Sequence, residues 1–172
     1  KAVVVAQGTP KKVSNESVEE LLKTEDDLRC WAFRHNRHDF YIITSPSFTL
    51  VYDITTGFWS KWSSYQQPNW RAHLGVQNGT TMYAGDSTTN NVWLLDEGLS
   101  DNGDPVVREV SGFIPSNSRP YNAAAVHAYV NAGWSPDYTL EPTLELRWSP
   151  DLGATWSDYY PVGMGNKGEY IK

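Results

Sequence analysis

Apolar and polar residues alternate with a period of two along residues 48–62, the stretch with the clearest pattern in the chain. From Thr49 to Asp53, small or polar side chains alternate with larger apolar ones, as in a strand with one buried face. Thr55-Thr-Gly57 then interrupts the alternation with a residue that tolerates positive φ, and a second alternation follows it. The stretch therefore predicts a β-hairpin that is rich in aromatic residues.

Two further strands precede this hairpin, because the same alternation continues on both sides of turn-forming residues such as Asn36 and Pro46. Four consecutive antiparallel strands in about 36 residues form one sheet of the size of a β-propeller blade. An ordinary hairpin sheet of a β-sandwich is the alternative. The predicted strands cover residues 29–35, 39–45, 48–54 and 58–64.

A second set of strands follows at a similar spacing, over residues 70–77, 81–85 and 91–96. Asn78-Gly79 is a strong two-residue hairpin turn between the first two of them. The repetition favours propeller-type blades, and we expect two adjacent four-stranded sheets over residues 25–96. Because two blades do not close a propeller, we expect further blades upstream, and we interpret the chain, which starts without Met, as a fragment of a longer protein.

Residues 14–24 have the 3.6-residue period of a short amphipathic helix. Ser14 is the expected N-cap, and Ser17 and Glu20 have the spacing of a capping box. A helix of three turns at most needs packing against other elements to be stable. The apolar face available for this packing comprises Val18, Leu21 and Leu22.

The pattern changes after an acidic turn at residues 97–104. Longer alternating segments joined by Pro-containing loops predict a β-sandwich-like domain, so we divide the chain into domains of residues 1–104 and 105–172. The predicted fold class is all-β, with antiparallel β-propeller-type blades, one short helix near the N-terminus and the β-sandwich-like domain. The strands predicted in the second domain cover residues 106–113, 123–130, 143–148 and 156–162.

The segment Ser149-Pro-Asp-Leu-Gly-Ala-Thr-Trp156 matches S-x-D-x-G-x-T-W, the Asp-box turn. The Asp151 carboxylate is expected to accept backbone N–H groups of the turn, and Trp156 is expected to anchor the hairpin in a core. Because the motif occurs in sialidases and in many non-enzymes, we predict a structural role. The residues with this role are Ser149, Asp151, Gly153, Thr155 and Trp156.

Charge and cysteine content narrow the classes of function. The net charge of −6 argues against a surface that binds DNA phosphates throughout. Cys30 is the only cysteine, which excludes an internal disulfide and predicts a buried structural thiol. A cluster of acids without a basic residue among them predicts a solvated loop rather than a metal site. These acids are Asp96, Glu97, Asp101 and Asp104.

The histidines do not form a catalytic or metal-binding pattern. His35 and His38 have a spacing that metal ligands can use, but arginines flank them on a predicted hairpin tip, which favours solvent exposure or protonation. His73 and His127 lie in separate strands without an acid at a catalytic spacing, and the arginines are scattered rather than clustered as in a sialidase. We therefore predict no catalytic residues, no metal, no cofactor and no enzyme activity.

A series of short motifs resembles, in its order and spacing, the packaged-DNA stabilisation proteins, which are the tail hub or nozzle proteins of short-tailed bacteriophages and their prophages. The resemblance covers most of the chain, as the C-terminal portion of a longer family member. Besides the Asp-box, the motifs lie at residues 14–19, 38–43, 50–53, 59–62, 84–86, 92–96, 146–149 and 168–170.

The resemblance implies a β-propeller body and, in the full-length protein, a homo-oligomeric ring, a hexamer, that contacts the portal, the adaptor and other tail proteins. The ring would plug the portal channel, retain packaged DNA and pass it at ejection without tight binding. The acidic balance agrees with this role, because each phosphate contact would add affinity that impedes passage. The implied location is the virion, in the phage tail, after assembly in the host cytoplasm and without a membrane.

A carbohydrate-binding or sialidase-like β-propeller module is the main alternative, because the Asp-box and exposed tryptophans such as Trp59, Trp62 and Trp70 fit such proteins. Aromatic side chains form sugar-binding platforms, although tryptophans in strands more often belong to a core. A third class is a bacterial propeller scaffold with no viral link. Turnover of a glycoside would favour the first alternative, and binding to portal–adaptor complexes would favour the tail protein.

Overall fold

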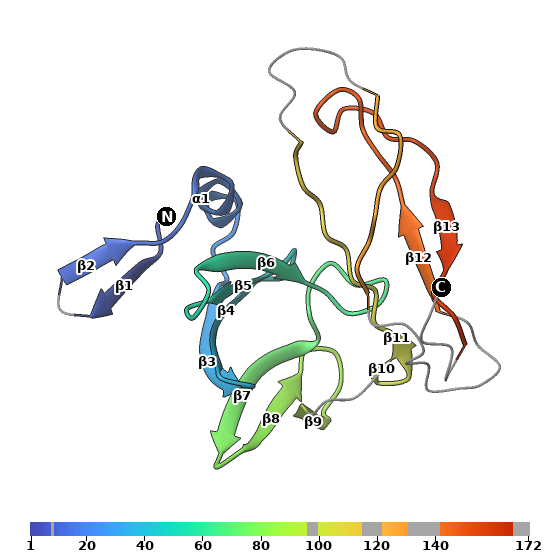
Figure 1. The fold of residues 1–172 in the computed structure, drawn as a ribbon. Helices are drawn as coiled ribbons and strands as arrows, with labels where there is room; N and C mark the ends of the chain where they lie inside the picture. The colour runs from blue at the N-terminus through green and yellow to red at the C-terminus, as the bar shows by residue number, and fades with distance from the viewer. Residues whose placement is uncertain (8, 96–99, 115–121, 131–141, 167–172) are drawn as a thin grey trace. The chain divides into compact units, whose positions relative to one another are not determined.

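The computed structural model describes residues 1–7, 9–95, 100–114, 122–130 and 142–166. Antiparallel sheets and a single short helix make up the regular structure of these residues, which confirms the predicted all-β fold class (Figure 1). The chain divides into two compact units, Lys1–Val107 and Arg108–Lys172. We call them the first and the second unit and describe each by itself.

The first sheet has the strand order β3-β4-β5-β6, with every neighbouring pair antiparallel. Asn36 and Arg37 both have positive φ, +48° and +68°, in the two-residue turn from β3 to β4. Gly57 has a φ of +78° in the turn before β6, as the break in the alternation predicts. The four predicted strands are confirmed: β3 (Arg29–His35), β4 (His38–Thr44), β5 (Thr49–Asp53) and β6 (Phe58–Trp62).

The second sheet has the order β7-β8-β9, with a bulge between Ala72 and Leu74. The turn at Gly79, with a φ of +62°, joins its first two strands. The prediction of four strands is wrong within the described residues, because the next hairpin, β10 with β11, pairs only with itself. The bounds of these strands are β7 (Ala72–Asn78), β8 (Thr81–Asp86), β9 (Val92–Leu95), β10 (Ser100–Asp101) and β11 (Asp104–Pro105).

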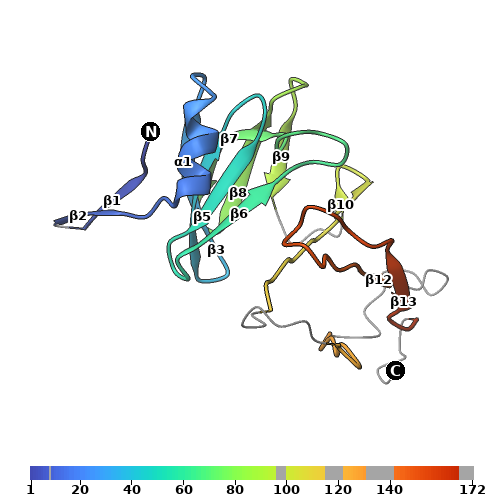
Figure 2. The same ribbon diagram turned by 90° about the horizontal axis from the view of Figure 1, so that it is seen from above.

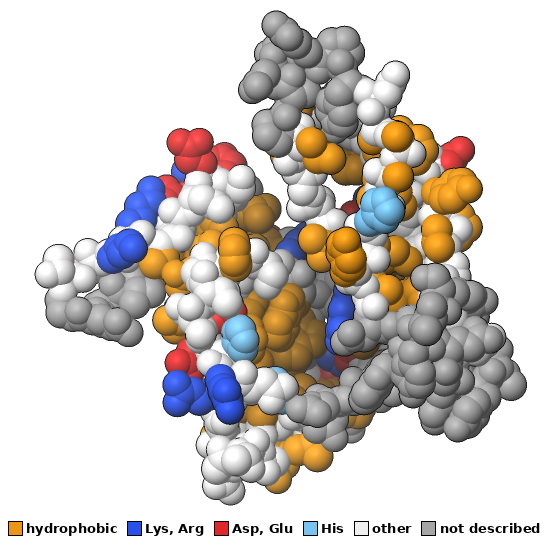
Figure 3. All heavy atoms as spheres, viewed as in Figure 1, with side chains coloured by type: hydrophobic (Ala, Val, Ile, Leu, Met, Phe, Trp, Pro, Cys, Tyr) orange, Lys and Arg blue, Asp and Glu red, His pale blue; other side chains and the backbone are white. Residues whose placement is uncertain are grey.

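The two sheets pack against each other through a core that both supply, and hydrophobic side chains gather there (Figure 3). Ile42 and Val51 of the first sheet have no exposed surface. Partly buried aromatic rings surround this core, and the ring centroids of Trp31 and Trp70 are 5.8 Å apart. The buried core residues are Trp31, Ile42, Val51, Ala72, Met82 and Ala84.

The helix α1 (Glu16–Lys23) covers the other face of the first sheet (Figure 2). Val18 and Leu22 are buried there, whereas Leu21 is 38% exposed and does not belong to the packed face as predicted. The N-cap is Asn15, whose Oδ1 accepts the Val18 N–H at 2.9 Å. The prediction of Ser14 is wrong because the Ser14 hydroxyl instead accepts the Val3 N–H and donates to Glu19.

A hairpin of β1 (Val4–Gln7) and β2 (Thr9–Lys12) precedes the helix. The Val13 N–H donates to the Val3 carbonyl and closes the base of this hairpin. The indole N–H of Trp59 in β6 donates to the Val13 carbonyl at 2.9 Å. This bond connects the segment before the helix to the first sheet.

The second unit contains one two-stranded antiparallel sheet among its described residues, β12 (Thr143–Leu146) with β13 (Tyr160–Gly163). These strands correspond to the predictions for residues 143–148 and 156–162, although both are shorter. The strands predicted over residues 106–113 and 123–130 are not present. An alternating segment forms a strand only where a neighbouring strand pairs with it and other residues cover its apolar side chains. Val110 and Tyr129 of these segments are almost fully exposed.

Candidate functional site

An aspartate organises the turn from β5 to β6. Asp53 Oδ1 accepts the N–H groups of Thr55 at 2.9 Å and Thr56 at 3.4 Å, and Oδ2 accepts the Thr56 hydroxyl at 2.7 Å. His38 Nδ1 lies 2.7 Å from the same Oδ2, and the His38 ring stacks on Phe40. Burial alone would raise the pKa of Asp53, but the hydrogen bonds from Thr56 and His38 hold it below its usual value.

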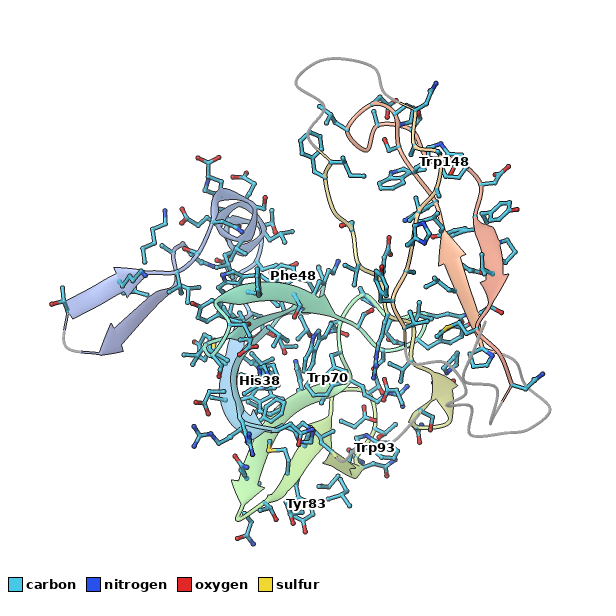
Figure 4. The ribbon with its side chains drawn as sticks, viewed as in Figure 1. His38, Phe48, Trp70, Tyr83, Trp93 and Trp148 are labelled. Carbon is cyan, nitrogen blue, oxygen red and sulfur yellow. The ribbon has the colours of Figure 1, made fainter. Side chains whose placement is uncertain are left out.

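The same arrangement recurs in the turn from β8 to β9. Asp86 Oδ1 accepts the Thr88 N–H at 2.7 Å, the Thr88 hydroxyl at 2.8 Å and the Thr89 N–H at 3.2 Å. Asp86 Oδ2 accepts the indole N–H of Trp93 at 2.8 Å. Trp93, labelled in Figure 4, belongs to β9. Burial raises the pKa of Asp86, yet the hydrogen bonds of Thr88, Trp93 and Thr89 lower it far more, so the carboxylate stays charged.

The Asp-box brings its five predicted residues together in a third turn of this kind. Asp151 accepts the Thr155 N–H at 2.7 Å and the Thr155 hydroxyl at 2.6 Å, and Ser149 accepts the Gly153 N–H at 2.7 Å. The hydrogen bonds from Thr155 and Ser149 lower the pKa of Asp151 to about 2. The role of these residues stays a prediction.

Trp156 contacts the Asp-box turn rather than a core. Its indole N–H donates to the Gly153 carbonyl at 3.2 Å, and the Arg147 guanidinium lies 4.6 Å from the centroid of its ring. The side chain is 46% exposed. The expected anchoring of this hairpin in a core is therefore wrong for the described residues.

Sequence reasoning predicted turns after Asp53 and Asp86 but missed the role of these two aspartates in them. Both have the pattern D-x-T-T, which begins at Asp53 and again at Asp86 and leads into the last strand of each sheet. A tryptophan in the following strand, Trp59 or Trp93, is also common to both. This repeated pattern is the signal that could have identified them.

The acidic cluster is partly neutralised by a residue distant in the sequence. Arg71 Nε lies 3.5 Å from Asp101, and its guanidinium Nη2 lies 3.4 Å from Asp104. Arg71 therefore pairs with two of the acids, although no basic residue lies among them in the sequence, and the prediction of a solvated loop rather than a metal site stays a prediction. Asp96 and Glu97 lie outside the described residues. No group of three or more metal-ligating side chains occurs in the described part of the chain.

The remaining candidate residues, a cysteine, a histidine and two arginines, each contact different partners. Cys30 is exposed, so the prediction of a buried thiol is wrong, because its side chain lies on the face of the first sheet that α1 only partly covers. His73 Nδ1 lies 3.3 Å from the guanidinium Nη1 of Arg29, at the start of β3. Arg34 and Arg147 pair with different carboxylates, Asp39 and Glu109.

The tryptophans considered as sugar platforms pack inside the first unit. Trp62 meets Trp70 edge-on, with ring centroids 5.0 Å apart, and Trp59 packs on Tyr52 at 4.9 Å. All three tryptophans are partly buried, so the expectation that they are exposed is wrong. The carbohydrate alternative therefore loses one of its two supporting observations.

Comparison with known proteins finds one family. A family model for phage stabilisation proteins, described as bacteriophage P22 Gp10, β-propeller, matches residues 2–100. The match covers more than half of the chain and includes both sheets of the packed pair. No curated protein matches the chain significantly. None of the described helices has the length and hydrophobicity that a membrane crossing requires.

Proposed function

Because the chain belongs to the phage stabilisation family of bacteriophage P22 Gp10, we propose that it retains packaged DNA in the phage particle. Members of this family are phage structural proteins, and the chain is accordingly a component of the virion. In the proposed role, it acts at the tail hub or nozzle, plugs the portal channel and forms part of the conduit for DNA at ejection.

One observation carries the proposal: the family match over residues 2–100 coincides with the two packed sheets of the first unit. A rigid β-sheet body suits a protein that works by occupying a channel, because packed sheets resist deformation. The net charge of −6 also suits a conduit, since few phosphates would be neutralised during passage.

The proposed partners are other copies of the protein and the proteins at the portal. Identical subunits would form a ring, a hexamer, on the portal and adaptor, and other tail proteins would follow. We propose that the protein has no catalytic activity. Two sets of paired side chains support this view, because they stabilise turns and loops. His38 is hydrogen-bonded to Asp53, and Arg71 pairs with Asp101 and Asp104.

The test is a phage in which the gene is deleted and then restored on a plasmid. Particles without the protein should lose nuclease-protected DNA, and the wild-type gene should restore it. A matched pair of variants tests whether DNA retention depends on the packed core of the first unit: Ile42→Ala removes a fully buried side chain, and Ile54→Ala changes one that is 39% exposed. Only the first should fail to restore DNA retention.

Two outcomes would contradict the proposal. Full DNA retention in particles that lack the protein would exclude the retention role. Turnover of any compound in a panel of glycosides and sialosides would exclude a purely structural role. Binding of the full-length protein to purified portal–adaptor complexes, measured by sedimentation, is the expected positive result.

A further inference from the structure

The Asp-box turn of the second unit holds an aromatic ring at the surface. The indole N–H of Trp156 donates to the Gly153 carbonyl at 3.2 Å, and the Arg147 guanidinium lies 4.6 Å from the centroid of this ring. The same guanidinium lies 4.8 Å from the centroid of the Tyr159 ring. Glu109 accepts a hydrogen bond from Nη2 of Arg147 at 2.8 Å. These contacts fix the orientation of both aromatic rings.

Each of the two rings has one face in contact with protein and one face open. Arg147 lies over one face of each ring, as a cation does when it stacks on an aromatic side chain. Trp156 is 46% exposed and Tyr159 is 53% exposed, so the other faces remain accessible to solvent. We call Arg147, Trp156 and Tyr159 the aromatic platform.

The aromatic platform continues the polar face of the hairpin formed by β12 and β13. Strand register pairs Glu145 with Pro161, and Arg147 and Tyr159 lie two residues further along their segments, on the same face. An exposed pair of aromatic rings on a polar face is not explained by the packing of a core and indicates a binding surface. The aliphatic residues of the hairpin lie on the opposite face: Leu144, Leu146 and Val162.

The size of the aromatic platform indicates a small ligand. Two half-exposed aromatic side chains offer on the order of 200 Å² of contact surface. Stable association with another protein buries roughly 800 Å² on each partner. Because the aliphatic residues of the hairpin lie on the other face, they do not extend this surface towards the size of a protein interface.

The polar groups around the platform suit a ligand with hydroxyl groups. A guanidinium has five N–H donors, and the hydrogen bond to Glu109 uses one of those of Arg147. Exposed carboxylates nearby, on Glu145 and Asp158, accept hydrogen bonds. With Glu109, three carboxylates surround one guanidinium, which disfavours a phosphate or another anion. A sugar ring fits this set, because its C–H groups pack on an aromatic face and its hydroxyls bond to the polar groups.

We propose that the aromatic platform binds a neutral oligosaccharide, with one sugar ring on the open face of Trp156 and another on that of Tyr159. Arg147 orients both rings and donates hydrogen bonds to hydroxyl groups of the ligand. The Asp-box turn positions Trp156 through the Gly153 carbonyl. The site lies outside residues 2–100, to which the family match is confined. The inference is independent of the DNA-retention role, and binding leaves the sugar chemically unchanged.

An array of oligosaccharides tests the proposal with the full chain. Its neutral members are linear oligosaccharides of glucose, galactose, mannose and N-acetylglucosamine, and its acidic members are sialylated and sulfated. At least one neutral member should bind, and titration calorimetry then gives its Kd. Trp156→Ala and Tyr159→Ala should each weaken binding about tenfold or more. Tyr159→Phe keeps the ring and should bind with nearly the wild-type Kd.

Trp148→Ala is the matched control, because it removes a tryptophan that is 58% exposed and follows Arg147 directly but lies outside the platform. It should bind as the wild type does. Failure of every neutral oligosaccharide to bind, or binding of acidic ones alone, would overturn the proposal. Equal losses of affinity in Trp148→Ala and Trp156→Ala would overturn it as well, and so would a Tyr159→Phe variant that binds as weakly as Tyr159→Ala.

Discussion

At the scale of single residues, carboxylates that accept several hydrogen bonds hold the turns of this protein. Asp53, Asp86 and Asp151 each accept a backbone N–H and a threonine hydroxyl, and the pKa of each is lowered. A carboxylate satisfies two or more donors at once, so a short loop needs no other acceptor. Histidine and tryptophan extend two of these networks, through His38 and Trp93.

Asp86→Ala should lower the free energy of unfolding of the first unit by about 1–2 kcal/mol, because it leaves several donors without their acceptor. The indole N–H of Trp93 and the N–H groups of Thr88 and Thr89 lose their partner. Urea unfolding at pH 7, followed by tryptophan fluorescence, measures the change. Asp27→Ala removes an exposed carboxylate and is the control. Equal unfolding midpoints for the two variants would contradict this prediction.

The lowered pKa values also predict how stability depends on pH. A depressed folded-state pKa contributes stability that is complete above the unfolded value of about 3.9 and is lost as the pH falls towards the folded value. Thermal unfolding should therefore shift to lower temperature between about pH 4 and pH 2, where Asp151 titrates with a pKa of about 2. The difference between wild type and Asp86→Ala should shrink over the same range. A constant difference would show that Asp86 acts without its charge.

Asp151→Ala should loosen the Asp-box turn without affecting the first unit. Thr155, which donates its N–H and its hydroxyl to Asp151, lies at the surface, so the loss is local. Amide hydrogen exchange at Thr155 should become faster, while exchange at Val51 should stay as slow as in wild type. The same variant should bind portal–adaptor complexes normally. Unchanged exchange at Thr155 would show that the carboxylate does not hold the turn.

Sequence patterns predict those contacts of the candidate residues that join positions close together in the chain. The Asp-box was recognised because all its hydrogen-bonding groups lie within eight residues, from Ser149 to Trp156. The ion pairs of Arg71 with Asp101 and Asp104 join residues about thirty positions apart, and no local pattern indicates them. The exposed state of Cys30 likewise depends on how far α1 covers the sheet.

At the scale of elements, the strands of the first sheet were predicted to within two residues, because short hairpins with turn residues such as Gly57 place their partners next to each other. Alternation alone failed for residues 106–113 and 123–130, since it reports an amphipathic pattern and not the presence of a pairing strand. The contact between Gly75 and Trp31, through which the two sheets pack, could not be predicted from the sequence either, because the two residues lie in separate hairpins.

Gly75→Ala should destabilise the contact between the two sheets by roughly 1–3 kcal/mol, the usual cost of overpacking a core. The added Cβ would overlap Met82, which can shift, and the ring of Trp31, which the surrounding core holds. Chemical denaturation measures the loss. The control is Gly112→Ala, where a Cβ would meet no atom within 4 Å. A Gly75→Ala protein as stable as Gly112→Ala would show that the sheets separate easily.

At the scale of the whole molecule, the packing of the sheets and the net charge both bear on the function. The packed sheets of the first unit provide a body whose apolar surfaces are used for contacts between sheets, and the second sheet leaves one such face uncovered. Polar recognition of nucleic acid would instead need clustered Lys and Arg, and the chain has 14 of these against 20 acids. The excess of acids over Lys and Arg is therefore compatible with the proposed role, in which the protein blocks or surrounds DNA without gripping it.

This view predicts that the chain binds duplex DNA weakly, with a Kd above about 10⁻⁴ M at 150 mM salt, the upper limit of ordinary non-specific binding. Fluorescence anisotropy with a labelled duplex at 150 mM salt measures the affinity, and the same titration at 50 and 200 mM salt measures its salt dependence. The control replaces three exposed acids, Glu16, Asp26 and Asp27, with lysine, which raises the net charge of −6 by about six and should create measurable, salt-sensitive binding. Micromolar binding by the wild-type chain, with a steep loss between the two salt concentrations, would mean that it grips phosphates and would contradict passage of DNA without tight contact.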